Sequence, residues 1–402
     1  MPSPLQAQIA TQTLPPLKPT TRNTYITLLK NSSQQKTGPL QNLPISLKDC
    51  FDLTGTVTTA GSLFYAQHNP IAEKNSWIAQ RLLNLGAIIT GKTHLHQLAY
   101  GITGENRDYG DCLQPLHPEL LTGGSSSGAA ASLQEGSALV AIGTDTGGSV
   151  RIPAALSGHV GYRTSHALNT ETLWAGGYHL APSFDTLGIL FHDLRDTQFL
   201  AHTIFDIPLA PAPRQLRIGY ATEAFVHDSN PEVRTAYESA KQLLAKHGAT
   251  LSPIDTAFWE EAQSIYAPIQ ASEASVIHRG FYQHFEPVIT ERLTAGAALT
   301  PEELATTRQR LADFRTQMAA LFETHDLLIA PCAPIHQLRV NEDHTESRKA
   351  ILRYTTPASL AGLPAITIPG KPHGTGTQLL AAANQDALLI AFASHLLPST
   401  QN

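Results

Sequence analysis

The chain has 402 residues, of which 42% are hydrophobic and 15% are charged, and its formal net charge is −6. This length is ample for a large hydrophobic core, and the mild negative charge gives no reason to expect a nucleic-acid partner. No apolar stretch approaches the roughly 20 residues of a membrane span, so no membrane partner is expected either.

The N-terminal region and the cysteines indicate the cellular compartment. Residues 1–10 lack the basic start and the apolar stretch of a secretory signal. Cys50, Cys112 and Cys332 have no metal-like spacing, which is typical of free thiols in a reducing compartment. We therefore expect a cytoplasmic protein. Residues 1–40 have room for at most one short helix, and the Pro/Thr-rich segment Thr11–Thr21 predicts a loop.

The first segment that suggests chemistry is Pro44–Asp49, in which an apolar run ends on Lys48. A lysine can act as a base only when it is neutral. Burial among the apolar residues of this run would lower the pKa of Lys48, because desolvation disfavours the charged form. A single lysine is far more often an exposed charge, so this hypothesis depends on two later segments.

His94 and His96 have the spacing of two metal ligands on one face of a strand. The chain has 18 histidines, so a metal enzyme is an alternative. No cluster of the HExxH type accompanies this pair, however. We therefore expect a surface or supporting role for both histidines, and no metal ion.

The second informative segment is Gly123–Gly128, which reads Gly-Gly-Ser-Ser-Ser-Gly. The small residues of Gly128–Leu133 predict a helix directly after it, so Ser125 is expected in a tight loop at a helix N-terminus. A flexible linker is disfavoured because apolar and helical segments flank the loop closely. A phosphate-binding loop is disfavoured because no Lys-Ser/Thr pair follows the last glycine.

The third segment places another serine at the end of a turn. The apolar run Leu139–Ile142 predicts a buried strand that ends at Gly143. Gly147 and Gly148 allow the backbone to turn sharply before Ser149. A serine presented in this way can attack a carbonyl carbon, and nearby backbone N–H groups can stabilise the resulting oxyanion. The predicted donors are the N–H groups of Thr146, Gly147, Gly148 and Ser149.

The segment Asn169–Leu180 carries Trp174 and Tyr178, which are predicted either to line a substrate pocket or to pack in the core. Trp259 and Tyr266 lie further along the chain and are predicted to pack in the core.

The second half of the chain contains further predicted elements. Pro208–Pro213 is a predicted linker, and Leu216–Tyr220 a predicted strand. Pro231–His247 has the pattern of an amphipathic helix. Ala257–Thr324 is mostly helical by pattern, with an interruption near Thr294–Pro301. Strands that alternate with helices predict an α/β architecture with a mixed central sheet.

Together, the segments around Lys48, Ser125 and Ser149 resemble the amidase signature family, with its Gly/Ser-rich signature and its Ser–cis-Ser–Lys triad. The resemblance implies that Ser149 is the nucleophile and that Lys48 is the base. It also implies that Ser125, which follows a cis peptide bond, relays the proton between them.

The resemblance covers most of the chain. It implies that Asp145, Arg151 and Ser126 support the nucleophile loop. One departure is Arg163, in a position where family members often have proline. A second departure is the short N-terminal region. Further segments that match are Asn23–Thr27, Thr59–Ser62, Gly91–Thr93, Gly104–Asn106, Pro182–Thr186, Asp326–Pro331 and Ala361–Ile366.

The family fold implied by this resemblance is one amidase-signature domain over residues 1–402, with helices on both faces of the central sheet. The core with the triad would occupy residues 22–204. A variable helical region would occupy residues 214–325, and strands and a helix that return to the core would occupy residues 326–402.

The activity implied is hydrolysis of a carboxamide to a carboxylic acid and ammonia or an amine, with a serine acyl-enzyme and no cofactor. The chain looks most similar to compact indole-3-acetamide hydrolases, which favours a small aryl- or indole-acetic amide as substrate. Carbamates, ureas and anilides are alternatives. A tRNA-dependent amidotransferase component and a catalytically silent binding protein are alternatives from other classes. A homodimer is one option for the assembly.

Overall fold

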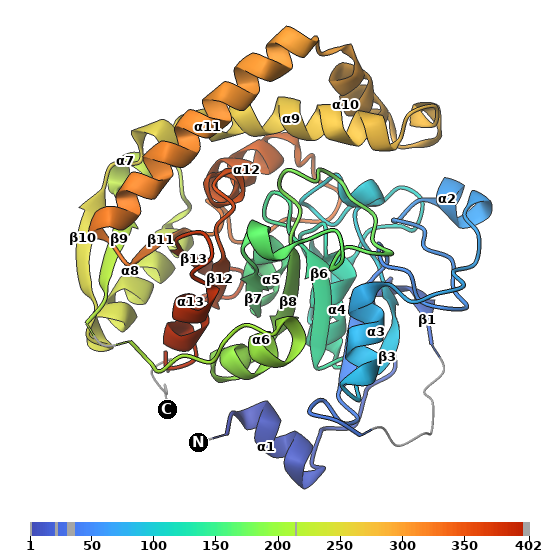
Figure 1. Cartoon of the computed structure of the whole chain (residues 1–402), viewed down its shortest axis with the longest axis horizontal. Coiled ribbons are helices and arrows are strands. Elements are labelled where there is room, and N and C mark those ends of the chain that lie inside the picture. Colours follow the sequence, from blue (N-terminus) through green and yellow to red (C-terminus); the bar gives the residue numbers. More distant parts are fainter. Residues whose placement is uncertain (1, 21–22, 30–36, 214, 397–402) are drawn as a thin grey trace.

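The computed structural model describes residues 2–20, 23–29, 37–213 and 215–396. Its centre is an eleven-stranded sheet in the order β1-β3-β2-β6-β8-β7-β12-β13-β11-β9-β10 (Figure 1). The strands of this sheet are β1 (Tyr25–Leu28), β2 (Pro44–Lys48), β3 (Ile88–Thr93), β6 (Val140–Thr144), β7 (Val160–Arg163), β8 (Leu187–Phe191), β9 (Arg217–Ala221), β10 (Thr250–Ile254), β11 (Leu327–Pro331), β12 (Ala365–Pro369) and β13 (Gly376–Ala381). The short strands β4 (Leu113–Gln114) and β5 (His117–Leu121) form a separate pair.

The sheet is mixed, as the sequence predicts. Strand β2 is parallel to both β3 and β6, and β9 is parallel to both β10 and β11. The central strands β6, β8, β7, β12, β13 and β11 pair antiparallel in that order. Every residue is buried in the strands β2, β6, β7, β8, β11 and β13.

Helices cover both faces of this sheet. The α-helices are α1 (Pro4–Thr11), α2 (Leu63–His68), α3 (Trp77–Asn84), α4 (Ser127–Glu135), α5 (Arg151–Ser157), α6 (Thr197–Phe205), α7 (Glu223–Val226), α8 (Pro231–Lys246), α9 (Ala262–Ile277), α10 (Pro287–Ala298), α11 (Pro301–Thr324), α12 (Thr345–Leu360) and α13 (Asp386–Ala393). None of these described helices combines the length and the apolar character needed to cross a membrane.

Neighbouring residues of β7 show the two layers, because successive side chains of a strand point to opposite faces. A Cβ on Gly161 would lie 2.6 Å from the Cβ of Ala154 in α5. The next residue, Tyr162, donates a hydrogen bond of 2.5 Å to Asp386 in α13. Helices α5 and α13 therefore pack on opposite faces of the sheet.

Several predicted elements are confirmed. The apolar run before the turn of Ser149 forms β6, the small-residue helix is α4, and the strand after the linker is β9. The amphipathic helix is α8, which buries Val233, Tyr237 and Leu244 on one face. The predicted interruption of the helical region falls between the end of α10 and the start of α11 at Pro301.

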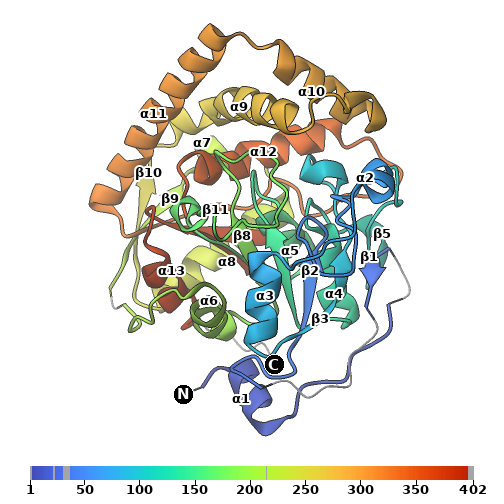
Figure 2. The same ribbon diagram turned by 45° about the vertical axis from the view of Figure 1, so that its right-hand side comes forward.

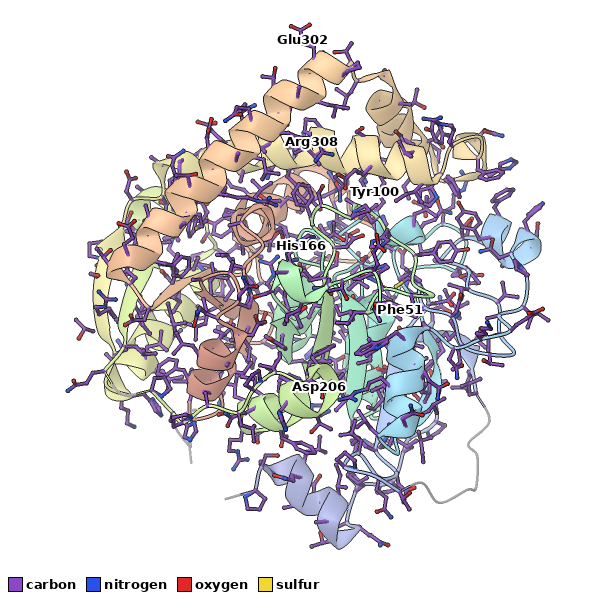
Figure 3. The ribbon with its side chains drawn as sticks, viewed as in Figure 1. Phe51, Tyr100, His166, Asp206, Glu302 and Arg308 are labelled. Atoms are coloured by element: carbon purple, nitrogen blue, oxygen red, sulfur yellow. The ribbon has the colours of Figure 1, made fainter. Side chains whose placement is uncertain are left out.

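Helices α9, α10 and α11 form a layer over one end of the molecule, which we call the helical cap (Figure 2). Helix α12 lies between the cap and the sheet and contacts both α9 and α11. Figure 3 shows Tyr100 and His166 between cap and sheet, whereas Glu302 lies at the outer end of α11. The cap and α12 therefore cover the loops that leave the end of the sheet nearest to them.

Candidate active site

Lys48 and Thr144 lie side by side because they are the last residues of two neighbouring parallel strands, β2 and β6. The Nζ atom of Lys48 donates hydrogen bonds of 2.7 Å to the hydroxyls of both Ser125 and Thr144. Among the described residues no carboxylate pairs with Lys48. The adjacent Asp49 pairs instead with Lys92, with 2.6 Å between Oδ1 and Nζ. The lysine is fully buried and has only hydroxyl partners.

This environment changes the charge of Lys48. Burial lowers its pKa from the ordinary 10.5 to about 8, because an ammonium group loses its hydration there. A substantial fraction of Lys48 is therefore neutral slightly above neutral pH. A neutral amine in hydrogen-bond contact with a serine hydroxyl can accept its proton.

Ser125 lies in the loop between β5 and α4. The Gly124–Ser125 peptide bond is cis, the conformation that the resemblance implies. A Cβ on Gly124 would lie 2.9 Å from the backbone nitrogen of Gly104, so the close approach of these two segments requires a glycine. The backbone carbonyl of Ser125 accepts a hydrogen bond of 3.2 Å from the amide of His96.

Ser149 lies in the turn between β6 and α5 and is 3% exposed. Its carbonyl accepts a hydrogen bond of 3.2 Å from the amide of Ser126, which ties this turn to the loop of Ser125. The Ser126 hydroxyl in turn donates to the carbonyl of Thr144 at 3.2 Å. The fold thus brings the segments of Lys48, Ser125 and Ser149 together at the end of the sheet where β2 and β6 terminate.

One of the four backbone amides predicted to bind the oxyanion, that of Gly148, already has an acceptor. The Gly148 amide donates a hydrogen bond of 2.8 Å to Asp145 Oδ1, so it is already used within the turn. The amides of Thr146, Gly147 and Ser149 have no acceptor among the described residues. Three of the four predicted donors are therefore free to bind an oxyanion.

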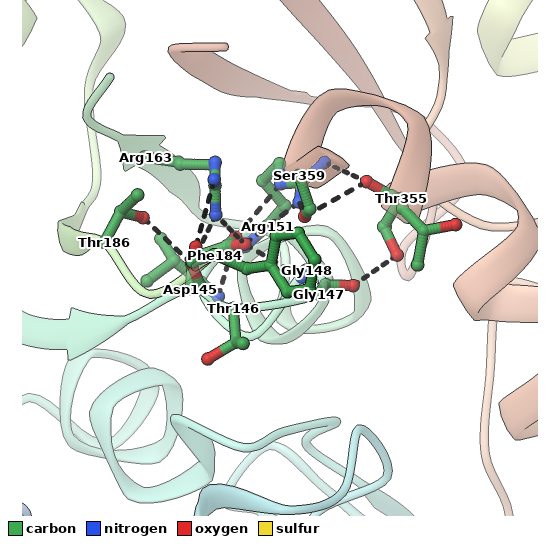
Figure 4. Close-up of polar contacts among 12 residues, drawn as sticks. Asp145, Thr146, Gly147, Gly148, Arg151, Arg163, Phe184, Thr186, Thr355 and Ser359 are labelled. Carbon is green, nitrogen blue, oxygen red and sulfur yellow. Dashed lines mark hydrogen bonds and ion pairs between the residues drawn. The ribbon is translucent and has the colours of Figure 1, made fainter. Parts of the chain in front are cut away.

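Asp145 organises this turn through a cluster of buried charges (Figure 4). Its Oδ1 atom lies 2.9 Å from a guanidinium nitrogen of Arg151 and 2.9 Å from one of Arg163, and all three side chains are fully buried. Arg151 also donates to the carbonyl of Thr355 at 3.0 Å, which connects the turn to α12. Burial alone would raise the pKa of Asp145, but the two arginines outweigh this effect and hold the pKa below its usual range.

Replacement of Asp145 is expected to destabilise the whole protein. Asp145→Asn removes the counter-charge of two buried guanidinium groups, which typically costs about 3–5 kcal/mol of unfolding free energy. Urea unfolding measures this loss. Glu238→Gln, which removes the partner of Lys241 in a surface pair, is the control and should cost at most about 1 kcal/mol. Equal unfolding midpoints for the two variants would contradict a supporting role for Asp145.

A narrow pocket adjoins Ser149, with about 260 Å³ of empty space including its mouth. Its walls come from the segment before the Ser125 loop, from the nucleophile turn, from α9 and from α12. The lining residues are Ala99, Tyr100, Gly101, Ile102, Thr146, Gly147, Ser149, Leu180, Tyr266, Gln270, Arg348 and Leu352. A larger surface hollow between α8 and β12 contains none of the candidate catalytic residues.

Of the two placements predicted for Trp174 and Tyr178, the structure excludes the pocket wall. Neither Trp174 nor Tyr178 lines this pocket. The amide of Tyr178 donates to the carbonyl of Cys50 at 2.8 Å, and Phe51 forms a β-bridge with Gly177. These contacts hold the segment against the loop after β2, so the prediction of a pocket role for both residues is corrected.

Trp174 instead packs in the core, 4% exposed, with its ring 5.9 Å from that of Phe51 and 4.5 Å from that of His179. Trp259 is likewise buried, against Phe225. Of the four aromatic residues considered from the sequence, Tyr266 of α9 is the one that lines the pocket, together with Tyr100. A Cβ on Gly147 would lie 2.5 Å from the Tyr266 hydroxyl, so this tyrosine lies directly on the nucleophile turn.

The position of Trp174 leads to a stability prediction. Trp174→Ala should lower the unfolding free energy by about 3–5 kcal/mol, the usual cost of removing a buried aromatic side chain. Because Trp174 does not contact the pocket, kcat/KM should change by a similar factor for large and small amides. Urea unfolding and a pair of amides of different size measure the two effects. A loss confined to the large amide would restore Trp174 to the pocket.

The two candidate metal ligands have other roles. His94 is hydrogen-bonded through Nδ1 to Ser127 and through Nε2 to the carbonyl of Gly110, each at 2.8 Å. The ring of His96 lies against Gly101, where a Cβ would be 2.1 Å from its Nε2. Burial lowers the pKa of His94 to about 4 and that of His96 to about 3, so both rings are neutral at physiological pH. Within the part of the chain that the structure describes, no group of three or more metal-binding side chains comes together.

Sequence reasoning missed four residues that contact the candidate site, namely Thr144, Arg163, Arg348 and Thr355. Thr144 could have been found, since it ends the strand that leads to Ser149. Thr355 and Arg348 come from α12, about 200 residues after Ser149, and no local motif marks them. Thr355 donates a hydrogen bond to the carbonyl of Gly147 and thereby fixes the turn against α12.

Comparison with known proteins gives relatives over most of the chain. A 2-amino-5-chloromuconic acid deaminase from Comamonas testosteroni is 32% identical and covers 89% of this chain and 82% of its own. One of the subunits of the glutamyl-tRNA(Gln) amidotransferase from Synechococcus sp. (strain RCC307) is 31% identical, with 90% and 84% covered. An indoleacetamide hydrolase from Pseudomonas savastanoi is 31% identical, with 89% and 83% covered.

Solved structures give the same assignment. A crystal structure of an amidase superposes with a TM-score of 0.80 and 30% sequence identity, and covers 89% of this chain and 84% of its own. The model of the family described as Amidase matches residues 19–390. The chain therefore belongs to the amidase family, the amidase signature enzymes.

Proposed function

We propose that this enzyme hydrolyses a small amide through an acyl-enzyme on Ser149. The Ser149 oxygen bonds to the carbonyl carbon while its proton passes to Ser125, and Ser125 gives its own proton to neutral Lys48. The C–N bond then breaks, and the same relay returns the proton to the leaving nitrogen. Water hydrolyses the acyl-enzyme by the reverse sequence. The scheme requires neither a metal ion nor an organic cofactor.

The observation that carries this proposal is the contact between Lys48 and Ser125. A hydrogen bond of 2.7 Å joins a fully buried lysine to a serine hydroxyl, and no carboxylate pairs with that lysine among the described residues. A purely structural buried lysine would normally have an acidic partner, as Lys92 has in Asp49. A lysine without one is free to exchange a proton.

The free amides support the same chemistry. The N–H groups of Thr146, Gly147 and Ser149 belong to the turn that carries the proposed nucleophile, and they have no acceptor among the described residues. A preorganised donor of this kind typically contributes about 2.7–4 kcal/mol to transition-state stabilisation. Asp145 and Arg151 keep the turn in place before the substrate arrives.

The named activities of the relatives concern C–N bonds in several settings. An indoleacetamide hydrolase supports the expected carboxamide, and a component of a 1-carboxybiuret hydrolase supports a urea-type substrate as the alternative. The resemblance to indole-3-acetamide hydrolases favoured an aryl- or indole-acetic amide, for which Trp174 and Tyr178 were the candidate pocket walls. Because these residues lie outside the pocket, the proposal here extends only to small amides.

The second candidate function is that of an amidotransferase component that passes ammonia to a partner, as the name of one group of relatives indicates. The test is a panel of simple amides, carbamates and ureas, with the purified chain alone and released ammonia or amine as the readout. The amidase proposal predicts turnover without any partner. Turnover that begins only when a partner protein and tRNA are added would support the second candidate instead.

A further inference from the structure

Arg348 is a half-buried cation in the pocket beside Ser149, and it has no counter-charge among the described residues. It lies in the first turn of α12 and lines this pocket. Its Nε atom is buried and has no hydrogen-bond partner in the described part of the chain. Neither an ion pair nor a side-chain hydrogen bond involves its guanidinium group within the described ranges, although the other arginines of the site, Arg151 and Arg163, have both.

The geometry of α12 directs Arg348 towards the reacting centre. Arg348, Leu352, Thr355 and Ser359 are spaced by four, three and four residues, so they share one face of the helix. On that face Thr355 bonds to the carbonyl of Gly147, and Ser359 accepts a hydrogen bond of 2.9 Å from Arg151. The face that holds the nucleophile turn therefore also presents Arg348, two turns closer to the helix N-terminus.

The groups around Arg348 do not neutralise its positive charge, and one of them, Arg292, is itself positive. Arg292 of α10 interacts repulsively with it, and burial together with this repulsion lowers the pKa of Arg292 to about 10. Tyr100 and Tyr266 face Arg348 with neutral rings, since burial raises the pKa of Tyr100 to about 12 and also raises that of Tyr266 well above its ordinary value. His96, also nearby, is neutral. Glu286 and Glu291 attract Arg292.

Such an arrangement is costly unless something else supplies the negative charge. A guanidinium group taken out of water without a hydrogen-bonded partner is strongly unfavourable. Arginine is the side chain best suited to bind a carboxylate, because its planar group can donate two parallel hydrogen bonds. A ligand carboxylate in this pocket would accept a hydrogen bond from the unpaired Nε atom of Arg348. Its negative charge would also offset the repulsion between Arg348 and Arg292.

We propose that Arg348 binds a carboxylate of the substrate, so that the substrate is a short amide whose acyl group ends in a carboxylate, such as the monoamide of a small dicarboxylic acid. This inference rests on the proposed amide hydrolysis at Ser149.

Matched substrates test the proposal. Succinamate and glutaramate carry the carboxylate, whereas succinamide and glutaramide have the same size and a neutral amide in its place. We expect kcat/KM to be at least about 100-fold higher for each carboxylate than for its neutral partner, because a site built for a polar group rejects analogues that leave it unpaired. Equal values for the members of each pair would overturn the proposal, and so would faster cleavage of N-acetylglycine, which has its carboxylate on the amine side.

Variants of Arg348 test the assigned residue. Arg348→Met should remove most of the preference for the carboxylate, with the loss on succinamate at least about 30-fold larger than the loss on succinamide. Arg348→Lys should retain part of the preference, because the charge remains but the two-point contact is lost. The control is Arg315→Met, a partly buried arginine of α11 that donates to the carbonyl of Leu360 and should leave the preference intact. Equal losses on both substrates in Arg348→Met would mean that this residue only holds the fold.

A binding measurement separates this inference from the proposed reaction. In the Ser149→Ala protein, about 10 mM succinamate should raise the Tm and succinamide should not, because a ligand that binds only the folded state stabilises it. The Tm shift should disappear when Arg348→Met is added. A shift without any turnover by the unmodified enzyme would refute amide hydrolysis and retain the carboxylate site. Turnover of neutral amides without a shift would do the reverse.

Discussion

Ser149→Ala is expected to lower kcat/KM for amide hydrolysis by about 10³-fold or more, because the acyl-enzyme cannot form without the hydroxyl. The fold should remain intact. The Ser149 hydroxyl has no hydrogen bond to the described residues, so its removal leaves no buried partner unsatisfied. Ammonia release measures the activity, and the urea midpoint measures the stability.

A buried serine of the neighbouring helix provides the matched control. Ser157, at the end of α5, donates a hydrogen bond of 3.3 Å to the carbonyl of Thr122 and lies outside the pocket. Ser157→Ala should retain activity within a few-fold, although it loses some stability. More than about one hundredth of the original activity in Ser149→Ala would count against Ser149 as the nucleophile.

Lys48 should give the enzyme a rising pH profile. The group acts as a base only when neutral and its pKa is about 8, so kcat/KM should increase with pH and level off above that value. Below pH 8 the protonated fraction grows, and activity should fall about tenfold per pH unit. A steady-state pH series for one amide measures this limb. A profile that is flat from about pH 6 to about pH 9 would contradict Lys48 as the base.

Variants of Lys48 separate charge from proton transfer. Lys48→Arg keeps the charge but cannot deprotonate, so it should be as inactive as Lys48→Met, with losses of about 10³-fold. The exposed Lys74 provides the control, and Lys74→Arg should behave like the unmodified enzyme. Activity in Lys48→Arg above about one tenth of the original value would exclude a role of Lys48 in proton transfer.

The same pKa shift affects stability, with a definite sign. The folded state releases the Lys48 proton near pH 8, whereas the unfolded chain keeps it up to its ordinary pKa of 10.5. Unfolding between these values therefore takes up a proton, and the contribution of Lys48 to stability rises with pH across this window. Lys48→Met removes the penalty of the buried charge. It should therefore unfold at a higher urea concentration than the unmodified protein at about pH 7.

The local chemistry of the site could be predicted from the sequence because it depends on short segments. The glycines around Ser125 and Ser149 fix tight loops wherever the rest of the chain lies, and the apolar run before Lys48 predicts a buried strand. The regular spacing of apolar residues in Pro231–His247 likewise predicts α8. These features depend on neighbours in sequence, so the patterns suffice.

The rest could not be predicted because it depends on contacts between distant segments. Arg348 and Thr355 reach the nucleophile turn only through the packing of α12. The loss of Gly148 as an oxyanion donor follows from the rotamer of Asp145, which two arginines fix. Trp174 is a large aromatic residue of the kind that often lines a pocket. The β-bridge between Gly177 and Phe51 instead holds its segment in the core.

The most direct test of the central claim is covalent labelling with a fluorophosphonate probe, followed by peptide mass spectrometry. Such a probe reacts with serines that a base has activated. The mechanism predicts one label per chain, on Ser149, and a loss of amidase activity in proportion to the labelled fraction. It also predicts no label in Ser149→Ala and strongly reduced labelling in Lys48→Met. Labelling of a different residue, or full activity in a protein completely labelled at Ser149, would contradict the mechanism.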